Sequence, residues 1–261
     1  MRRITIALQK GGTGKSTTAH ALGQGLQHQG FRVLFLDLDP QGNLTYTMQA
    51  EAGEPTAFEV MTKKATAKEA IQQTSQGHII PASPQLSGAD LEITQTGKEY
   101  RIKEALRPIQ NLYDFCIIDT PPALGTLTVN ALAAATEVII PVQADTYSIQ
   151  GIGQLYSTID AVKAYCNPGL IVEGILITRY NSRAILSRDL ADTIDATASQ
   201  LGTKLFKTTI REGIAVKEAQ ARREPLYRYA PNSNPAQDYH EFICEYLQNK
   251  TGEEGHAKEK L

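Results

Sequence analysis

The sequence predicts an α/β fold, with a doubly wound, mostly parallel sheet that carries helices on both faces. Three observations lead to this prediction. Short apolar runs rich in β-branched residues recur along the chain, segments of helical length separate them, and a glycine-rich loop follows the first run directly. Nearly continuous apolar runs of this kind are typical of parallel strands that are covered on both sides.

The expected elements alternate along the chain, which implies right-handed strand–helix–strand crossovers. The predicted parallel strands are residues 3–8, 32–39, 115–119, 137–142 and 170–178, and residues 77–82 are expected to add a further strand. The predicted helices are residues 15–29, 88–107, 126–135, 149–164 and 188–200. Residues 50–75 are weakly patterned, and we expect them to form short helices over one edge of the sheet.

The chain is long enough for one sizeable core, since 41% of its 261 residues are apolar. No linker or repeat interrupts residues 1–250, which we expect to form a single domain. Residues 236–249 carry aromatic and aliphatic side chains at helical spacing, and this pattern predicts a terminal helix docked on the core. Residues 251–261 are polar and are expected to form a disordered tail.

Charge and cysteine content exclude several broad classes of protein. The net charge of −2 argues against a chain that is basic throughout, but residues 179–228 hold ten Lys and Arg against six Asp and Glu. This segment suits a local phosphate-backbone contact, and an ordinary solvated face is the alternative. Cys116, Cys166 and Cys244 lack metal-ligand spacing. With no signal-peptide or membrane-spanning pattern, we expect a cytoplasmic protein with free thiols.

The glycine-rich loop predicts a phosphate-binding site. Backbone amides of such loops and the start of the next helix attract anions. Lys15 is expected to reach the β- and γ-phosphates, and the Ser16 hydroxyl to bind Mg²⁺. Gln9 replaces the first glycine of the general pattern, but the strand before and the helix after support the assignment. The remaining residues expected to contact the nucleotide here are Gly11, Gly12, Thr13, Gly14 and Thr17.

Carboxylates end two of the predicted strands. Asp37 and Asp39 follow the second apolar run, and Asp119 ends the run at residues 115–119. The carboxyl ends of parallel strands face the ligand crevice, so these groups are expected near the phosphates. Asp119 suits a Mg²⁺ contact through water, and Asp39 could orient an attacking water. Acidic residues at strand ends can also merely cap the next helix, and that alternative stays open.

Four segments, in order, resemble the ParA/Soj family of DNA-partition ATPases, which belongs to the deviant Walker A class that also contains MinD. They are KGGTGKST, LDLDPQGN, IIDTPPALGTLTVNAL and VIIPVQADTYSIQGI. The likeness runs from about residue 4 to residue 247, with later matches at EGILITRY, VKEAQARREPL and RYAPNSNPAQDY. It implies a Mg²⁺-dependent ATPase that forms a homodimer when ATP is bound.

The resemblance also implies a role for each matched residue. Lys15 acts on the nucleotide of its own chain, whereas Lys10 crosses the dimer to the partner's phosphates. Asp39 activates the hydrolytic water and contributes to the Mg²⁺ site with Ser16 and Asp119, while Asp37 lies near the metal shell.

Two further regions are expected to contact the nucleotide. Asp119 begins a second switch, in which Thr120, Pro121 and Pro122 sense the γ-phosphate. Adenine is expected between residues 178–181 and 210–213, so that Thr178, Arg179 and Ile210 contact the nucleotide.

Non-specific binding of double-stranded DNA by the ATP dimer is a further implication. The first strand begins almost at Met1, so we expect no sequence-reading domain before it. Arg183, in YNSRA, falls where the family carries an arginine. The second segment expected to contact DNA differs from the family pattern. This chain reads REGIAVKEA at residues 211–219, where relatives carry PRNVRLSEA. The candidates to compensate are Arg211, Lys217, Arg222 and Arg223.

The expected function is therefore slow ATP hydrolysis, stimulated by a ParB-like partner, to segregate plasmid or chromosomal DNA on the nucleoid. The alternative is a MinD-like or ParA-like positioning ATPase that acts on a protein cargo. A membrane-surface regulator needs an apolar, basic amphipathic tail, which TGEEGHAKEKL does not provide. An iron–sulfur ATPase needs cysteines at the dimer face. A nucleotide-binding scaffold without turnover conflicts with the intact Lys15, Ser16, Asp39 and Asp119.

Overall fold

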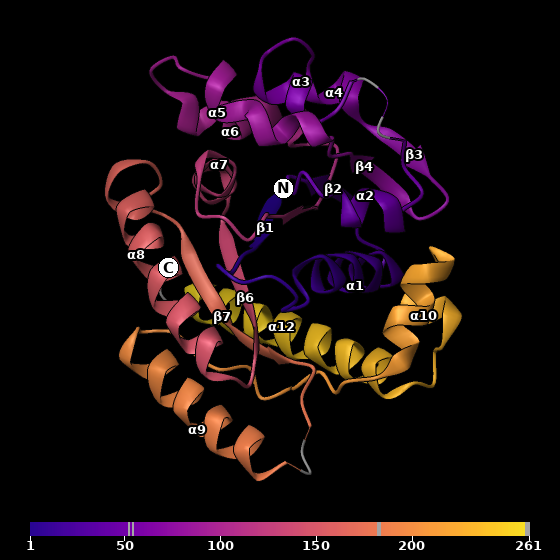
Figure 1. The fold of residues 1–261 in the computed structure, drawn as a ribbon, viewed down its shortest axis with the longest axis vertical. Coiled ribbons are helices and arrows are strands. Elements are labelled where there is room, and N and C mark those ends of the chain that lie inside the picture. Colours follow the sequence, from indigo (N-terminus) through magenta and orange to yellow (C-terminus); the bar gives the residue numbers. More distant parts are fainter. Residues whose placement is uncertain (52, 54, 182–183, 259–261) are drawn as a thin grey trace.

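The computed structural model describes residues 1–51, 53, 55–181 and 184–258. Within these residues, seven strands form one sheet in the order β3-β4-β2-β5-β1-β6-β7 (Figure 1). The strands are β1 (Arg2–Ile6), β2 (Val33–Asp37), β3 (Gln72–Thr74), β4 (Gly77–Ile80), β5 (Phe115–Asp119), β6 (Glu137–Gln143) and β7 (Ile171–Thr178). Every pairing is parallel except that of β3 with β4. The prediction of a doubly wound, mostly parallel sheet is confirmed.

Helices cover both faces of this sheet (Figure 1). They are α1 (Lys15–His28), α2 (Asn43–Thr47), α3 (Ala57–Met61), α4 (Ala67–Ala70), α5 (Ala89–Glu92), α6 (Arg101–Leu106), α7 (Thr126–Ala134), α8 (Thr146–Tyr165), α9 (Ile185–Gln200), α10 (Ile214–Arg222), α11 (Leu226–Tyr229) and α12 (Asn234–Lys258). Short 3₁₀ turns are η1 (Pro84–Gly88), η2 (Lys98–Tyr100) and η3 (Arg107–Ile109). No helix in the described part of the chain is both long and apolar enough to cross a membrane.

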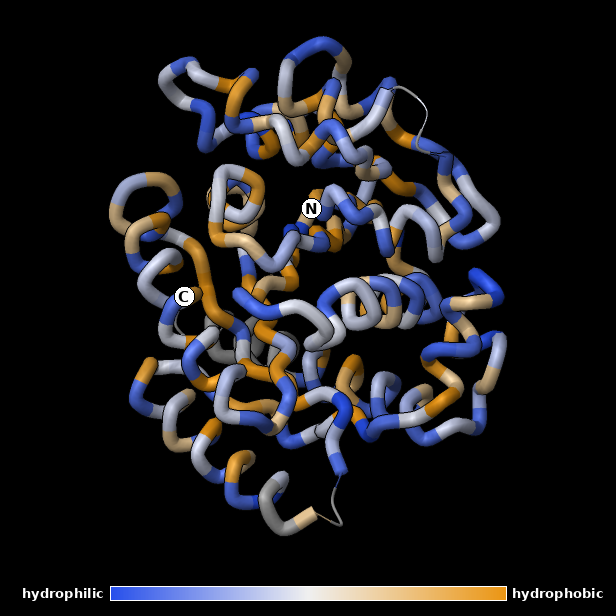
Figure 2. The backbone as a smooth tube through the Cα atoms, in the orientation of Figure 1, coloured by the Kyte–Doolittle hydropathy of each residue, from blue (hydrophilic) through white to orange (hydrophobic). Residues whose placement is uncertain are grey.

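Alternation along the strands divides the core between the two faces. On β2, Val33 and Phe35 pack with α1 and α12, whereas Leu34 and Leu36 pack with α3 and α6 on the opposite face. Successive side chains of a strand point to opposite faces, so a strand that is apolar throughout needs cover on both sides. Figure 2 accordingly shows hydrophobic residues along the central strands and hydrophilic residues toward the outside of the helices.

Two regions differ from the sequence prediction. The single helix predicted at residues 88–107 is wrong: η1, α5, η2 and α6 divide this segment, and Gly97 lies in the left-handed region at φ 83° between the pieces. Residues 50–75 contain the expected short helices α3 and α4, but also the antiparallel edge strand β3. The polar sequence of β3 gave no apolar pattern to detect.

The last helix is longer than predicted. The aromatic side chains of α12 that were expected to face the core are buried there, including Tyr239, Phe242 and Tyr246. The helix begins at Asn234 and its backbone continues to Lys258, past the expected end at residue 249. Residues 259–261 and the side chains of residues 249–258 lie outside the description. The disordered tail and the domain boundary at residue 250 stay predictions.

Strand β1 lies at the centre of the sheet, between β5 and β6. The glycine-rich loop that follows it therefore emerges beside the ends of both neighbours, and α1 then packs back over β1, β2 and β5. The close approach of α1 to the sheet depends on Gly23, because a Cβ atom there would lie 2.2 Å from Phe35 Cε1.

Replacing Gly23 by alanine is expected to destabilise the protein by about 1–3 kcal/mol through overpacking against Phe35. The matched control is Gly153→Ala on α8, where nothing lies within 4 Å of the new Cβ. That change is expected to stabilise the protein by about 0.5–1 kcal/mol, because glycine weakens a helix interior. Urea unfolding measures both values, and equal effects at the two positions would contradict the packing argument.

Candidate functional site

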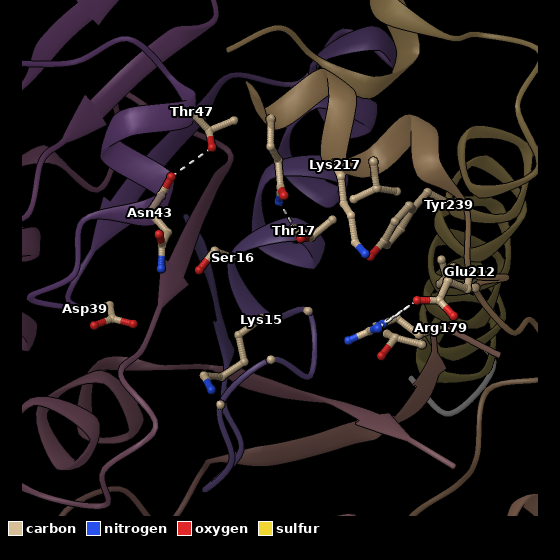
Figure 3. A pocket seen from close by; sticks show the side chains of 18 of the residues that line it. Lys15, Ser16, Thr17, Asp39, Asn43, Thr47, Arg179, Glu212, Lys217 and Tyr239 are labelled. Carbon is tan, nitrogen blue, oxygen red and sulfur yellow. Dashed lines mark hydrogen bonds and ion pairs between the residues drawn. The ribbon is translucent and has the colours of Figure 1, made fainter. Parts of the chain in front are cut away.

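A pocket of about 630 Å³ opens where β1, β2 and β7 end (Figure 3). The glycine-rich loop and the start of α1 form its base, and α10 closes one side. The lining residues that the sequence assigned to the nucleotide are Gly11, Gly12, Gly14, Lys15, Ser16, Thr17, Asp39, Pro122, Thr178, Arg179 and Ile210. The sequence prediction did not include Asn43, Tyr46, Thr47, Val216, Gln220 or Tyr239, which also line it.

The conformation of the loop requires glycine at two positions. Gly12 and Gly14 lie at φ 77° and 83°, in the left-handed region that glycine reaches without strain. Gly14 is also the N-cap of α1. The loop thus turns directly into a helix N-terminus, which is a favourable site for a phosphate group.

Side chains from three elements hold the loop carbonyls. Lys15 Nζ donates to the Lys10 carbonyl at 2.7 Å, and Gln143 Nε2, at the end of β6, donates to the Gly12 carbonyl at 2.7 Å. Thr178 Oγ1, at the end of β7, donates to the Thr13 carbonyl at 2.8 Å. With these carbonyls bound, the loop amides are left to face an anion. Gln143 lies within a motif quoted above, but its contact with the loop could not be predicted from sequence.

Three aspartates lie below and beside this loop. Asp119 is fully buried, and its carboxylate makes no hydrogen bond of normal length and geometry within the described residues, although the Ser16 hydroxyl lies close to it. Burial, followed by the neighbouring Asp37, raises its pKa well above the ordinary value, while the Ser16 hydroxyl and Lys15 oppose this shift. An acid that is buried without a partner is costly to ionise, so Asp119 is suited to a cation.

Asp37 has a different environment from Asp119. Its carboxylate accepts hydrogen bonds from Thr45 N at 2.8 Å, Thr45 Oγ1 at 2.7 Å and Asp39 N at 3.0 Å. Burial nevertheless raises the pKa of Asp37 to about 6. Asp37 therefore fixes the loop that carries Asp39 into the pocket.

The cation partners of these acids come from the loop itself. Burial lowers the pKa of Lys15, while Asp119 and Asp39 act to raise it. The oxygen groups of Ser16, Asp39 and Asp119 are the hard ligands that Mg²⁺ prefers, usually shared with substrate phosphates. No cluster of three or more His, Cys, Asp or Glu in the described part of the chain could hold a metal alone. The orphaned Asp119 and the glycine cradle together fit Mg²⁺ and a nucleotide.

Lys10 points away from the pocket of its own chain. Its ammonium pairs with Asp145 at the N-cap of α8, lies 3.5 Å from Ser148 Oγ and sits over the Tyr147 ring. Burial acts to raise the pKa of Asp145, but the hydrogen bonds from Lys10 and Ser148 outweigh it, and the pKa is lowered. Among the residues predicted to contact the nucleotide or its metal, those that do not line the pocket are Lys10, Thr13, Asp119, Thr120 and Pro121. The role predicted for Lys10 across a dimer stays a prediction.

The basic residues predicted for DNA fall into two groups. Arg211 and Lys217 line the nucleotide pocket, and Arg211 Nε lies 3.0 Å from Asp238 Oδ1. Arg222 and Arg223 lie outside the pocket at the end of α10, stacked on Tyr229 and Tyr46 respectively. Arg183 lies outside the described residues. The placement of Arg211 and Lys217 weakens their assignment to DNA.

A buried polar network connects the pocket with Arg223. Gln76 Nε2 donates to the Thr47 carbonyl at 2.8 Å and to the Arg223 carbonyl at 2.9 Å, and its Oε1 lies 2.8 Å from His20 Nε2. Burial lowers the pKa of His20 to about 4, so the imidazole is neutral at physiological pH. Gln76 therefore joins α1, α2 and α10 at one point.

The comparisons with known proteins agree with this geometry. Residues 1–172 match a family model described as an AAA domain. The chain is 37% identical over 251 residues to the sporulation initiation inhibitor protein Soj of Bacillus subtilis, covering 94% of this chain and 98% of Soj. It is 38% identical over 248 residues to the chromosome-partitioning ATPase Soj of Thermus thermophilus, covering 95% and 96% of the two chains. The chain belongs to the ParA/Soj family of ATPases.

Solved structures extend this family assignment to the ligands. Cobyrinic acid a,c-diamide synthase from Mycobacterium smegmatis, with bound ADP and magnesium, superposes with a TM-score of 0.84. It is 33% identical, and the match covers 96% of each chain. The chain described here is thus an ATPase of the ParA/Soj family that uses ATP and Mg²⁺. The sequence predictions of family, fold, ATPase activity and cofactors are confirmed.

Replacing Asp119 by asparagine is expected to raise the Tm of the protein by about 3–6 °C at pH 7.5 without metal or nucleotide. The raised native pKa means that the folded state holds the proton more tightly than the unfolded state. The contribution of Asp119 to the stability of the wild type is therefore lost as pH rises above about 3.8, the pKa of this carboxyl group in the unfolded state. The gain from asparagine should shrink at pH 5, where the aspartic acid is more protonated.

Differential scanning calorimetry in EDTA provides this measurement. Asp189→Asn, at an exposed position on α9, is the control and should leave the Tm unchanged. A lower Tm for Asp119→Asn at pH 7.5 would contradict the burial argument. Magnesium and ATP should stabilise the wild type but not the Asp119→Asn variant.

Proposed function

We propose that this chain is a partition ATPase that dimerises with ATP, binds DNA non-specifically and is stimulated by a ParB-like partner. It would segregate plasmid or chromosomal DNA in the cytoplasm while attached to the nucleoid. The relatives named as Soj support this role. One structural observation carries the link from ATP to DNA: Arg223 is bound to the helix that follows the Asp39 loop.

The contacts of Arg223 support such a link. Its guanidinium lies 4.5 Å from the centre of the Tyr46 ring, and its Nε donates to the Tyr46 carbonyl at 2.8 Å. Tyr46 lies on α2, whose Thr45 is bound to Asp37. A shift of the Asp39 loop on nucleotide binding would therefore reach the basic end of α10.

Each residue of the pocket has a defined task in this proposal. Lys15 neutralises the β- and γ-phosphates, Ser16 and Asp119 hold the metal, and Asp39 orients the attacking water. Bound Mg²⁺ would supply charge neutralisation on the phosphates. Lys10 would exchange Asp145 for the phosphates of a facing copy, so that the γ-phosphate favours dimerisation.

The variant Asp39→Ala is expected to bind ATP and accumulate as a dimer, because the water is no longer oriented and the nucleotide persists. Size-exclusion chromatography with light scattering, with and without ATP, measures the mass. Adding Lys10→Ala to this variant should return the protein to a monomer in the presence of ATP. A monomeric Asp39→Ala protein with ATP bound would contradict the proposed switch.

DNA binding is expected only in the ATP state, and the double variant Arg222→Ala, Arg223→Ala should weaken it about tenfold. The plot of log affinity against log salt concentration has a negative slope, and each lost phosphate contact makes this slope less steep by about 0.9. Gel retardation of Asp39→Ala with ATP, with ADP and without nucleotide tests this, and Lys163→Ala is the control for lost charge. Unchanged binding of the double variant would refute the placement. No binding in any state would favour the protein-cargo alternative.

A further inference from the structure

Lys217 occupies an unexpected place for a predicted DNA contact. It is the fourth residue of α10, and it lines the nucleotide pocket together with Tyr239, toward which its side chain points in Figure 3. Tyr239 is itself buried, and its hydroxyl lies 3.0 Å from Thr18 Oγ1 on α1. Lys217 is an exposed residue, and it lines the pocket on the side of Tyr239 and the first turns of α1.

The neighbouring Gln220 shows which part of the pocket this helix face addresses. Residues three apart on a helix share a face, so Lys217 and Gln220 point the same way. Gln220 Nε2 donates to Thr17 Oγ1 at 2.8 Å. Thr17 follows Lys15 and Ser16 at the N-terminus of α1, where phosphate groups bind favourably. The Lys217 ammonium therefore lies on the side of the pocket between this N-terminus and Arg179 (Figure 3).

Charge distinguishes Lys217 from the other cations of the pocket. Arg179 pairs with Glu212 at 2.7 Å, Arg211 pairs with Asp238, and Lys15 lies near Asp119 and Asp39. Within the described residues, no hydrogen bond or ion pair holds Lys217. A free ammonium in a pocket that receives a polyanion has an attractive partner there.

We propose that Lys217 is a nucleotide-binding residue and not a DNA contact. Its ammonium binds the phosphate nearest the ribose, while Lys15 serves the terminal phosphates. The position corresponds to serine in the family pattern compared above. The proposal needs only the nucleotide site and is independent of DNA and of dimerisation.

The test is the affinity for ADP, which avoids effects of ATP-driven dimerisation. Isothermal titration calorimetry with Mg²⁺ compares the wild type, Lys217→Ala, Lys217→Arg and the control Lys163→Ala, an exposed lysine on α8. Loss of one charge-assisted contact should raise the Kd of Lys217→Ala about tenfold. Lys217→Arg should stay within about threefold of the wild type, and Lys163→Ala should match it. The affinity of Lys217→Ala should also depend less on salt.

Two outcomes would overturn the proposal. A Kd for Lys217→Ala that equals the wild-type value would mean that the lysine does not bind the nucleotide, and a simultaneous loss of DNA binding would restore its assignment to DNA. Equal losses for Lys217→Ala and Lys217→Arg would mean that shape, not charge, is responsible. The Tm of each variant without ADP confirms that the comparison is made between folded proteins.

Discussion

The burial of the Asp119 carboxylate, with no well-formed hydrogen bond from the described residues, is the constraint around which this site is arranged. Its carboxylate lies at the end of a central strand, below the glycine loop, and its pKa is raised by burial and by Asp37. Such a group destabilises the empty protein and gains most from a cation. The fold thus preorganises the site for Mg²⁺ and nucleotide, because the loop amides, Lys15 and Asp119 are already placed before any ligand binds.

Hydrogen bonds between polar groups, and not packing of the apolar core, connect the pocket with the end of α10. Asp37 holds Thr45, Thr47 binds Gln76, and Gln76 binds the carbonyl of Arg223. Each of these contacts is short and most are buried, so moving one partner leaves a polar group unsatisfied. A change at the Asp39 loop and a change at the end of α10 are therefore linked in energy, although the two places are far apart in the sequence.

The sequence was sufficient for the parallel strands of the sheet and for the base of the pocket, and insufficient for the edge strand β3 and for the contacts that surround the pocket. Apolar strands covered on both faces and the loop from Lys10 to Thr17 have local signals that do not depend on distant partners. The contacts of Gln76, Gln143 and Gln220 have none, since an uncharged amide that binds a distant carbonyl or hydroxyl leaves no periodicity. The prediction of a single helix at residues 88–107 was wrong for a related reason, because composition did not reveal the left-handed turn at Gly97.

The arginine and lysine content of a segment does not reveal which of its cations are already paired. In the segment at residues 179–228, Arg179 and Arg211 are each paired with a carboxylate, and only partners distant in sequence decide this. A paired guanidinium has less to gain from a phosphate than a free one, since the existing pair must first be broken. The net positive charge of the segment therefore overstates the unpaired charge that it offers to a polyanion, and Arg222 and Arg223 are the described candidates that we propose for DNA. Arg222 ends α10 and Arg223 caps it, whereas Val216, Lys217, Gln220 and Ala221 of the same helix line the nucleotide pocket. The two polyanions that this protein is proposed to bind would therefore act on one short element.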